Sequence, residues 1–246
     1  SLLQIFYLFI YTISYIMKTI GLIGGISWQS TTVYYQILNR TVKERVGRYA
    51  SCKCLINSVN MAEIRQHQYA GAWDTLGDMM AEAATQLAAG GADMILICAN
   101  TMHKVAAAIE ARVSLPLIHI ADETAQVIQA QRLKKVGLLG THFTMQEDFY
   151  KGRLLEKHGI EVVVPNEKGI ETVNTIIYEE LIHGEIRDTS RQAYQEVIHE
   201  LVEAGAEGVI LGCTEIPLLI QQKDSPVPVF DTTYIHATAA VEAALG

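Results

Sequence analysis

Apolar and polar residues alternate along the chain with two different spacings. Short apolar runs broken by glycine, such as "TIGLIGG" at 19–25 and "DMILICAN" at 93–100, predict buried strands. Apolar residues at helical spacing over 73–90 and 191–206 predict long helices. Because strands and helices follow one another in turn, we expect an α/β fold with parallel sheets. Further strands are expected at 52–59, 115–120, 134–140, 159–165 and 207–212, and further helices at 30–45 and 101–113.

The order of elements repeats after about 115 residues. "GGADMILICANTMH" at 90–103 resembles "AGAEGVILGCTEIP" at 204–217, with an offset of 114 positions. "KTIGLIGGISWQ" at 18–29 resembles "KKVGLLGTHFTM" at 134–145, with an offset of 116. A period this long indicates a duplicated domain rather than a solenoid.

The duplication predicts two pseudo-symmetric, doubly wound parallel-sheet domains. We assign 17–115 plus about 228–246 to the first α/β domain and 116–227 to the second, so that the tail returns to the first domain as a strand and a helix. Ligands of such sheets bind beyond the carboxyl ends of the strands. The active site is therefore expected in the cleft between the two domains.

The first 16 residues do not fit this plan. "SLLQIFYLFIYTISYI" has no charge, no basic start and no small-residue cleavage site, and it is shorter than the roughly 20 residues of a membrane span. Met17 resembles a natural start. We interpret residues 1–16 as an expression or gene-start artefact, with a native hydrophobic arm or anchor as the competing interpretation.

The net charge and the spacing of the cysteines exclude several classes of binding partner. The formal net charge is -8, which argues against nucleic acid and anionic membranes, and an acidic substrate would need local donors. The four cysteines, at 52, 54, 98 and 213, show neither a Cys-x-x-Cys pair nor zinc spacing. We expect reduced thiols in the cytoplasm and no metal site.

Polar residues gather where the two related strands end. Cys213 follows "VILG" and precedes Thr214 and Glu215, and a thiol that faces helix N-termini is expected to have a lowered pKa. Cys98 lies inside its strand and is expected to be buried and inert. Cys213 is therefore the candidate base or nucleophile.

The first strand end carries short polar residues in place of a thiol. Asn100 and Thr101 can cap the following helix or hold a carboxylate at its N-terminus. His103 is either a proton carrier or an ordinary buried histidine, and the second interpretation also covers His119 and His236.

The glycine-rich stretch "GLIGGISWQST" raises the question of a nucleotide site. It lacks the Gly-x-Gly-x-x-Gly order, and no acidic residue ends the second strand to bind a ribose. The glycines fit the approach of a small anion better, with hydroxyls from Ser27, Ser30 and Thr31.

Together these motifs resemble the aspartate/glutamate racemase superfamily, most closely the bacterial broad-specificity aspartate/glutamate racemases. The resemblance rests on "Asn-Thr-Met-His", "Gly-Cys-Thr-Glu-Ile", "GLIGGISWQST" and "LLGTHFTM", and it covers Met17 to about Gly246. It implies an isomerase with no pyridoxal phosphate, no other cofactor and no metal. It also implies two thiols on opposite sides of the substrate Cα, a small acidic amino acid or dicarboxylate as ligand, and a homodimer.

The resemblance implies roles for individual residues. Cys213 would be one of the two bases. The residues expected to bind the substrate or to line the cleft are Gln68, Asn100, Thr101, Thr141, Thr144, Thr214 and Glu215.

The chain departs from the family at Ala99, the position of the missing first base. A methyl group transfers no proton, and Cys98, one residue away, should point to the opposite face. Three interpretations stay open: a slow racemase that uses water or Thr101, a one-sided isomerase or lyase-like enzyme, or an introduced substitution. A dicarboxylate-binding protein without turnover and a related Cys-dependent isomerase or hydrolase are two further hypotheses that the same residues allow.

Overall fold

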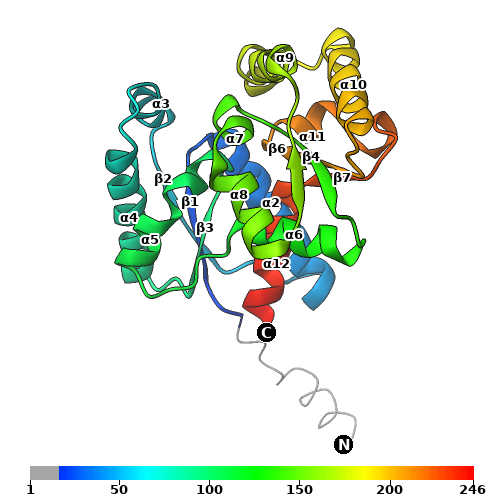
Figure 1. Ribbon diagram of the computed structural model, residues 1–246. Helices are drawn as coiled ribbons and strands as arrows, with labels where there is room; N and C mark the ends of the chain where they lie inside the picture. The colour runs from blue at the N-terminus through cyan, green and yellow to red at the C-terminus, as the bar shows by residue number, and fades with distance from the viewer. Residues whose placement is uncertain (1–16) are drawn as a thin grey trace, which may run out of the picture.

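The computed structural model describes residues 17–246, and the expectation for residues 1–16 lies outside them. Two parallel sheets form the framework (Figure 1). The first has the order β2-β1-β3 and the second the order β5-β4-β6-β7. Their strands are β1 (Ile20–Gly24), β2 (Cys54–Ser58), β3 (Met94–Ile97), β4 (Lys135–Gly140), β5 (Glu161–Val163), β6 (Val209–Gly212) and β7 (Val229–Asp231). The expected α/β fold with two parallel-sheet halves is confirmed.

Helices cover both sheets, and none of those between residues 17 and 246 combines the length and apolar character that a membrane span needs. The first half carries α2 (Trp28–Val46), α3 (Met61–Tyr69), α4 (Trp73–Ala89), η1 (Thr101–Val105) and α5 (Ala106–Arg112). The chain continues through α6 (Ile120–Ala130), α7 (His142–Gln146), α8 (Asp148–His158), α9 (Glu167–Glu179), η2 (Leu181–His183), α10 (Asp188–Glu203), α11 (Ile216–Leu219), η3 (Gln222–Asp224) and α12 (Thr232–Leu245).

The two halves repeat the same strand order. β1 lies between β2 and β3, as β4 lies between β5 and β6. Each central strand begins a half, and each pairs with the strand that ends at a candidate catalytic position. The duplicated sequences at 90–103 and 204–217 therefore occupy equivalent places in the two sheets.

Two predicted strands differ from the structure. The segment 115–120 forms only an isolated bridge between Leu117 and Ile95, since the preceding Pro116 has no N–H to extend the ladder. The strand of the tail, β7, joins the second sheet rather than the first, which makes that part of the prediction wrong. Its Phe230 lies opposite Ile210 and is buried in the core of the second half.

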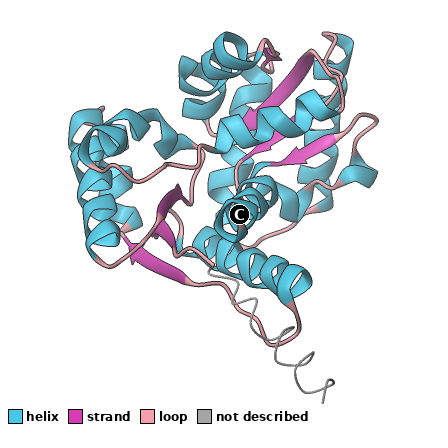
Figure 2. Ribbon diagram, turned by 90° about the horizontal axis from the view of Figure 1, so that it is seen from below, coloured by secondary structure: helices cyan, strands magenta, loops and turns pink. Residues whose placement is uncertain are grey.

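The helices that follow these two outer segments exchange places between the halves. α6 comes after the Leu117 bridge of the first sheet, yet it packs on Leu138 and Ile210 of the second. α12 comes after β7 of the second sheet, yet it packs on Ile20 and Leu22 of the first. The two helices also contact each other. α12, which ends at the marked C-terminus, lies between the groups of strands (Figure 2). α12 therefore packs on the first half, where the tail helix was predicted to return. Because each half receives a helix that follows a segment of the other, α6 and α12 connect the two hydrophobic cores.

We expect this exchange to make the two halves unfold together. Ile128 of α6 is fully buried in the core of the second half, so Ile128→Ala should lower the free energy of unfolding by about 2–5 kcal/mol. Urea denaturation should show one transition with the same midpoint by tryptophan fluorescence, which reports Trp28 and Trp73 of the first half, and by far-UV circular dichroism. The exposed Gln126→Ala on the same helix is the control. Separate midpoints for the two signals would contradict the coupling.

Candidate active site

The carboxyl ends of β3 and β6 face one cavity between the two halves. The cavity volume is about 60 Å³, which holds only a few water molecules. Nine of the residues singled out from the sequence line it: Ser27, Gln68, Ala99, Asn100, Thr101, Thr141, Cys213, Thr214 and Glu215. An amino acid can enter only when the side chains around this cavity move apart.

Glu215 lies at the centre of a hydrogen-bond network that joins the halves. Its Oε1 accepts hydrogen bonds from Ser27 Oγ at 3.2 Å and Ser30 Oγ at 3.0 Å, both at the start of α2 in the first half. Its Oε2 accepts from Cys213 Sγ at 3.0 Å and Thr214 Oγ1 at 2.6 Å. Four donors therefore satisfy a carboxylate that is 7% exposed. A substrate that contacts Glu215 directly, as the sequence predicts, would have to compete with these four donors for the carboxylate oxygens.

Cys213 is a protonated thiol in this arrangement. Burial, followed by the charge of Glu215, raises the pKa of Cys213 well above its ordinary value. The expected lowering by helix N-termini is wrong. The backbone N–H groups of Thr214 and Glu215 do favour the thiolate, but their effect is smaller than that of burial, and the following helix α11 has only four residues.

Three threonine hydroxyls form a second hydrogen-bonded cluster at the cavity, and two of them, those of Thr101 and Thr141, belong to residues that line it. Thr101 Oγ1 lies 2.9 Å from Thr141 Oγ1 and 3.2 Å from Thr144 Oγ1, so this cluster also spans the two halves. Thr144 is fully buried and does not line the cavity, contrary to expectation. Thr144 contacts Thr141 directly. Thr141 is the N-cap of α7, and its side chain accepts a hydrogen bond from the N–H of Thr144.

Asn100 presents an unused acceptor beside this cluster. Its Nδ2 donates to Thr232 Oγ1 at 3.1 Å, whereas its Oδ1 is buried with no hydrogen-bond partner. A buried carbonyl oxygen without a partner is costly and suits a ligand N–H donor. Asn100 does not cap η1 with its side chain.

Ala99 and Cys98 point to opposite faces of the first sheet, as expected. Ala99 packs with Ile97 and Met102, whereas Cys98 is fully buried beside Leu22 and α12. Burial raises the pKa of Cys98, which removes it further from acid/base chemistry. No thiol therefore takes the place of Ala99 on its side of the cavity, as far as residues 17–246 are concerned.

The hydroxyls of the glycine-rich loop serve the protein itself rather than a free anion site. Thr31 Oγ1 accepts a hydrogen bond from Gly25 N and donates one to Ser27 O. Gly25 has a φ of +86°, and a Cβ there would lie 2.1 Å from Val59 O, so only glycine fits. The loop thereby places Ser27 against Glu215.

Several residues that line the cavity were not identified from the sequence, among them Met61, Ile177, Tyr178 and Ile182. Tyr178 and Ile182 line it from the second half, and Arg65 lies over the Tyr178 ring with Cζ 4.8 Å from the centroid. Burial raises the pKa of Tyr178 to about 12, so its phenol stays neutral. Their segments show only the pattern of an amphipathic helix, and no sequence signal separates a cavity wall from a core position there.

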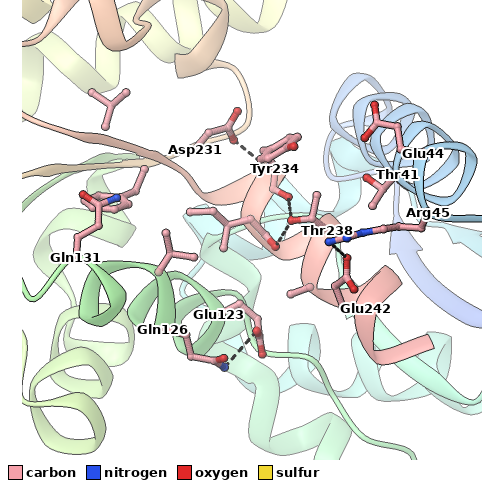
Figure 3. Close-up of a pocket in the computed structure, with 15 residues that line it drawn as sticks. Thr41, Glu44, Arg45, Glu123, Gln126, Gln131, Asp231, Tyr234, Thr238 and Glu242 are labelled. Carbon is pink, nitrogen blue, oxygen red and sulfur yellow. Dashed lines mark hydrogen bonds and ion pairs between the residues drawn. The ribbon is translucent and has the colours of Figure 1, made fainter. Parts of the chain in front are cut away.

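A larger surface cavity lies elsewhere, between α2, α6, α12 and β7 (Figure 3). Its volume is about 840 Å³, and its rim carries Glu44, Glu123 and Glu242, the last paired with Arg45 at 2.6 Å. Carboxylates disfavour an anionic ligand there, and none of the described residues that line it is a cysteine. Within residues 17–246 no group of three or more His, Cys, Asp or Glu side chains is arranged to hold a metal ion.

Comparison with known proteins agrees with this geometry. Residues 23–240 match the family model described as Asp/Glu/Hydantoin racemase. The chain belongs to this racemase family. It is 27% identical over 168 residues to the broad specificity amino-acid racemase RacX of Bacillus subtilis, covering 68% of this chain and 72% of that protein.

Solved structures of family members share the whole fold. A Yersinia pestis protein described as a candidate Asp/Glu racemase is 53% identical, with a TM-score of 0.89 over 94% of this chain and 100% of that one. An aspartate racemase homologue from Pyrococcus horikoshii is 38% identical, with a TM-score of 0.82 over 93% and 99% of the two chains. The chain therefore has the two-half fold of these racemase structures.

The protonated state of Cys213 can be tested by alkylation. The neighbouring Cys52 lowers the pKa of Cys54 below its ordinary value, whereas burial raises that of Cys213, so iodoacetamide at pH 7.5 should label Cys54 at least about tenfold faster than Cys213. Glu215→Gln removes the charge beside Cys213 and should accelerate its labelling, whereas the exposed Glu44→Gln should not. Peptide mass spectrometry measures each rate. Equal rates at the two cysteines would contradict the raised pKa.

Proposed function

We propose that this protein is a cofactor-independent racemase of aspartate, glutamate or both, with Cys213 as the acid/base on one face of the substrate Cα. The observation that carries the proposal is that Cys213 and Ala99, at equivalent strand ends, line one cavity from opposite halves. The reaction needs proton transfer on both faces of Cα. We infer that turnover is impaired or one-sided because Ala99 replaces the first base.

Cys213 and Glu215 form the reactive pair in this proposal. The thiol donates its hydrogen bond to Glu215 Oε2, so the carboxylate can accept the thiol proton when substrate binds. The resulting thiolate removes the Cα proton and later returns it. Ser27 and Ser30 keep Glu215 in place because they hold its other oxygen.

The opposite face has no protein base at residue 99. Protonation there depends on water in the cavity or on the Thr101 hydroxyl, which bonds Thr141 and Thr144. A hydroxyl of ordinary pKa is a poor proton donor compared with a thiol. If the Cys213 thiol exchanges its proton with heavy water before reprotonation, it returns a deuteron to the face that lost the proton, which gives exchange without inversion.

An acidic substrate requires local positive groups because the chain carries a net charge of -8. Of the described residues that line the cavity, none is lysine or arginine. Arg65 lies over the ring of Tyr178, which lines the cavity, and it shares helix α3 with Gln68, which also lines it. We assign the side-chain carboxylate of the substrate to Arg65, and its ammonium to the unpartnered Asn100 Oδ1.

The acid/base assignment predicts opposite effects at the two strand ends. Cys213→Ser should slow the exchange of the Cα proton of aspartate or glutamate in heavy water by about 10²–10⁴-fold. Ala99→Cys should raise racemisation by a similar factor because it supplies the missing base. Ala99→Val is the control, since it adds volume without a proton donor. Proton NMR follows loss of the Cα signal, and chiral chromatography follows inversion.

The outcomes separate the open interpretations. Exchange of both enantiomers with interconversion supports a racemase that uses a second acid, and exchange of one enantiomer without inversion supports a one-sided enzyme. Tight binding of aspartate or glutamate with no exchange would replace the proposal by a dicarboxylate-binding protein. Exchange unchanged in Cys213→Ser would remove Cys213 from the mechanism.

The substrate assignment predicts a selective effect at Arg65. Arg65→Met should raise KM for aspartate and glutamate by about 10–100-fold, because a charged hydrogen bond contributes about 1.5–3 kcal/mol. KM for a neutral amino acid should change little. Lys53→Met, in the same half but on the outer edge of the first sheet, controls for loss of one positive charge. An equal rise of KM for acidic and neutral substrates would contradict the assignment.

A further inference from the structure

Three buried histidines meet at the point where the chain crosses from the first half into α6. His103 comes from η1, His119 immediately precedes α6, and His236 comes from α12. The ring centroid of His103 lies 4.6 Å from that of His119 and 5.6 Å from that of His236. Their exposed fractions are 3%, 4% and 0%. We refer to these three residues as the histidine cluster.

All three histidines bond the backbone of the crossover segment 118–121. His236 Nε2 donates to Ile118 O at 2.8 Å, and His103 Nε2 accepts from Ile120 N at 3.3 Å. His119 Nδ1 accepts from Ala121 N at 3.2 Å. The histidine cluster thereby satisfies N–H groups in the first turn of α6 that have no partner within the helix.

The partners determine the protonation of the rings. A carbonyl oxygen only accepts, so His103 Nδ1 donates to Ala99 O at 2.8 Å while its Nε2 accepts. His236 Nε2 donates to Ile118 O while its Nδ1 accepts from Tyr34 Oη at 2.8 Å. Both rings are therefore neutral single tautomers. Burial agrees with this, since it lowers the pKa of His236 to about 4 and places that of His103 well below the ordinary value.

His103 links the candidate catalytic loop to an element of the other half. Its Nδ1 bonds Ala99, whose loop lines the cavity, and its Nε2 bonds the start of α6. α6 packs on Ile210 of β6, the strand that leads to Cys213. A continuous series of contacts therefore runs from Ala99 through His103 and α6 to β6, and it connects the end of β3 with the end of β6.

We propose that His103 is a positioning residue that sets the Ala99–Thr101 loop relative to Cys213, with His119 and His236 holding the crossover segment that it bonds. The predicted effect of His103 on turnover rests on the proposed function. The positioning of the loop by the bond from His103 to Ala99 O does not depend on whether the protein turns over a substrate. A loop displaced by about 1 Å can slow a reaction by about 10²-fold.

Two substitutions separate the two bonds of His103. His103→Asn places an amide N–H near the position of Nδ1 and keeps the bond to Ala99 O, whereas His103→Gln places an amide oxygen near Nε2 and keeps the bond from Ile120 N. We expect His103→Gln to lower kcat for Cα exchange by about 10–100-fold with KM little changed. His103→Asn keeps the bond to the loop but loses the bond to α6, so its kcat should lie between those of His103→Gln and the wild type. His199→Gln, at an exposed histidine of α10, controls for loss of a histidine.

Two measurements decide the proposal. The first is kcat and KM from exchange of aspartate in heavy water, and the second is the NMR signal of the Asn100 side-chain amide, which reports the loop without turnover. The proposal predicts that this signal shifts in His103→Gln and returns towards wild type in His103→Asn. It is overturned if the signal is equal in both variants, or if both lose stability while kcat per folded molecule stays unchanged.

The same data distinguish failure of the proposed function. A wild-type protein without exchange, in which the Asn100 signal still follows the two variants as predicted, would remove the racemase proposal and keep the positioning of the loop. Exchange in the wild type, together with equal kcat in both variants, would keep the racemase proposal and remove the positioning role of His103.

Discussion

The reciprocal exchange of α6 and α12 is the constraint on which the site depends. α6 follows a segment of the first sheet and packs on the second, whereas α12 follows a strand of the second sheet and packs on the first. Neither core is complete by itself, so the two halves are held at one separation by hydrophobic burial rather than by a few surface contacts. The carboxyl ends of β3 and β6, which come from different halves, can face one cavity only because of this arrangement.

Within that framework, one carboxylate organises the chemistry on the Cys213 side. Glu215 receives two hydroxyls from the first half and a thiol and a hydroxyl from its own. A buried carboxylate with four donors is well satisfied, and burial of Cys213 together with this neighbouring charge keeps the thiol protonated. The Ala99 side has neutral hydroxyls in place of a charge. The pseudo-symmetric scaffold therefore carries an asymmetric pair of proton-transfer sites.

The sequence predicted much of the cavity because strand ends in parallel sheets converge. Asn100, Thr101 and Cys213 were found from the duplicated strands, and Gln68 from the family resemblance, and all four line the cavity. Tyr178 could not be found in this way, since its place depends on how α9 packs over the second sheet. The raised pKa of Cys213 was likewise missed, because burial and the direction of the Glu215 side chain leave no trace in the spacing of residues.

The sequence by itself determined the α/β class, the duplication and the convergence of the strand ends, because these follow from periodicity and residue identity. The absence of a thiol at Ala99 was recognised only through the resemblance to the racemase family. Only the tertiary structure decided that β7 joins the second sheet while α12 covers the first, and that Thr144 lies behind Thr141. It also decided that three histidines meet at the crossover. The physical reason is that these features depend on contacts between residues far apart in the chain, such as Tyr34 and His236, which local patterns do not encode.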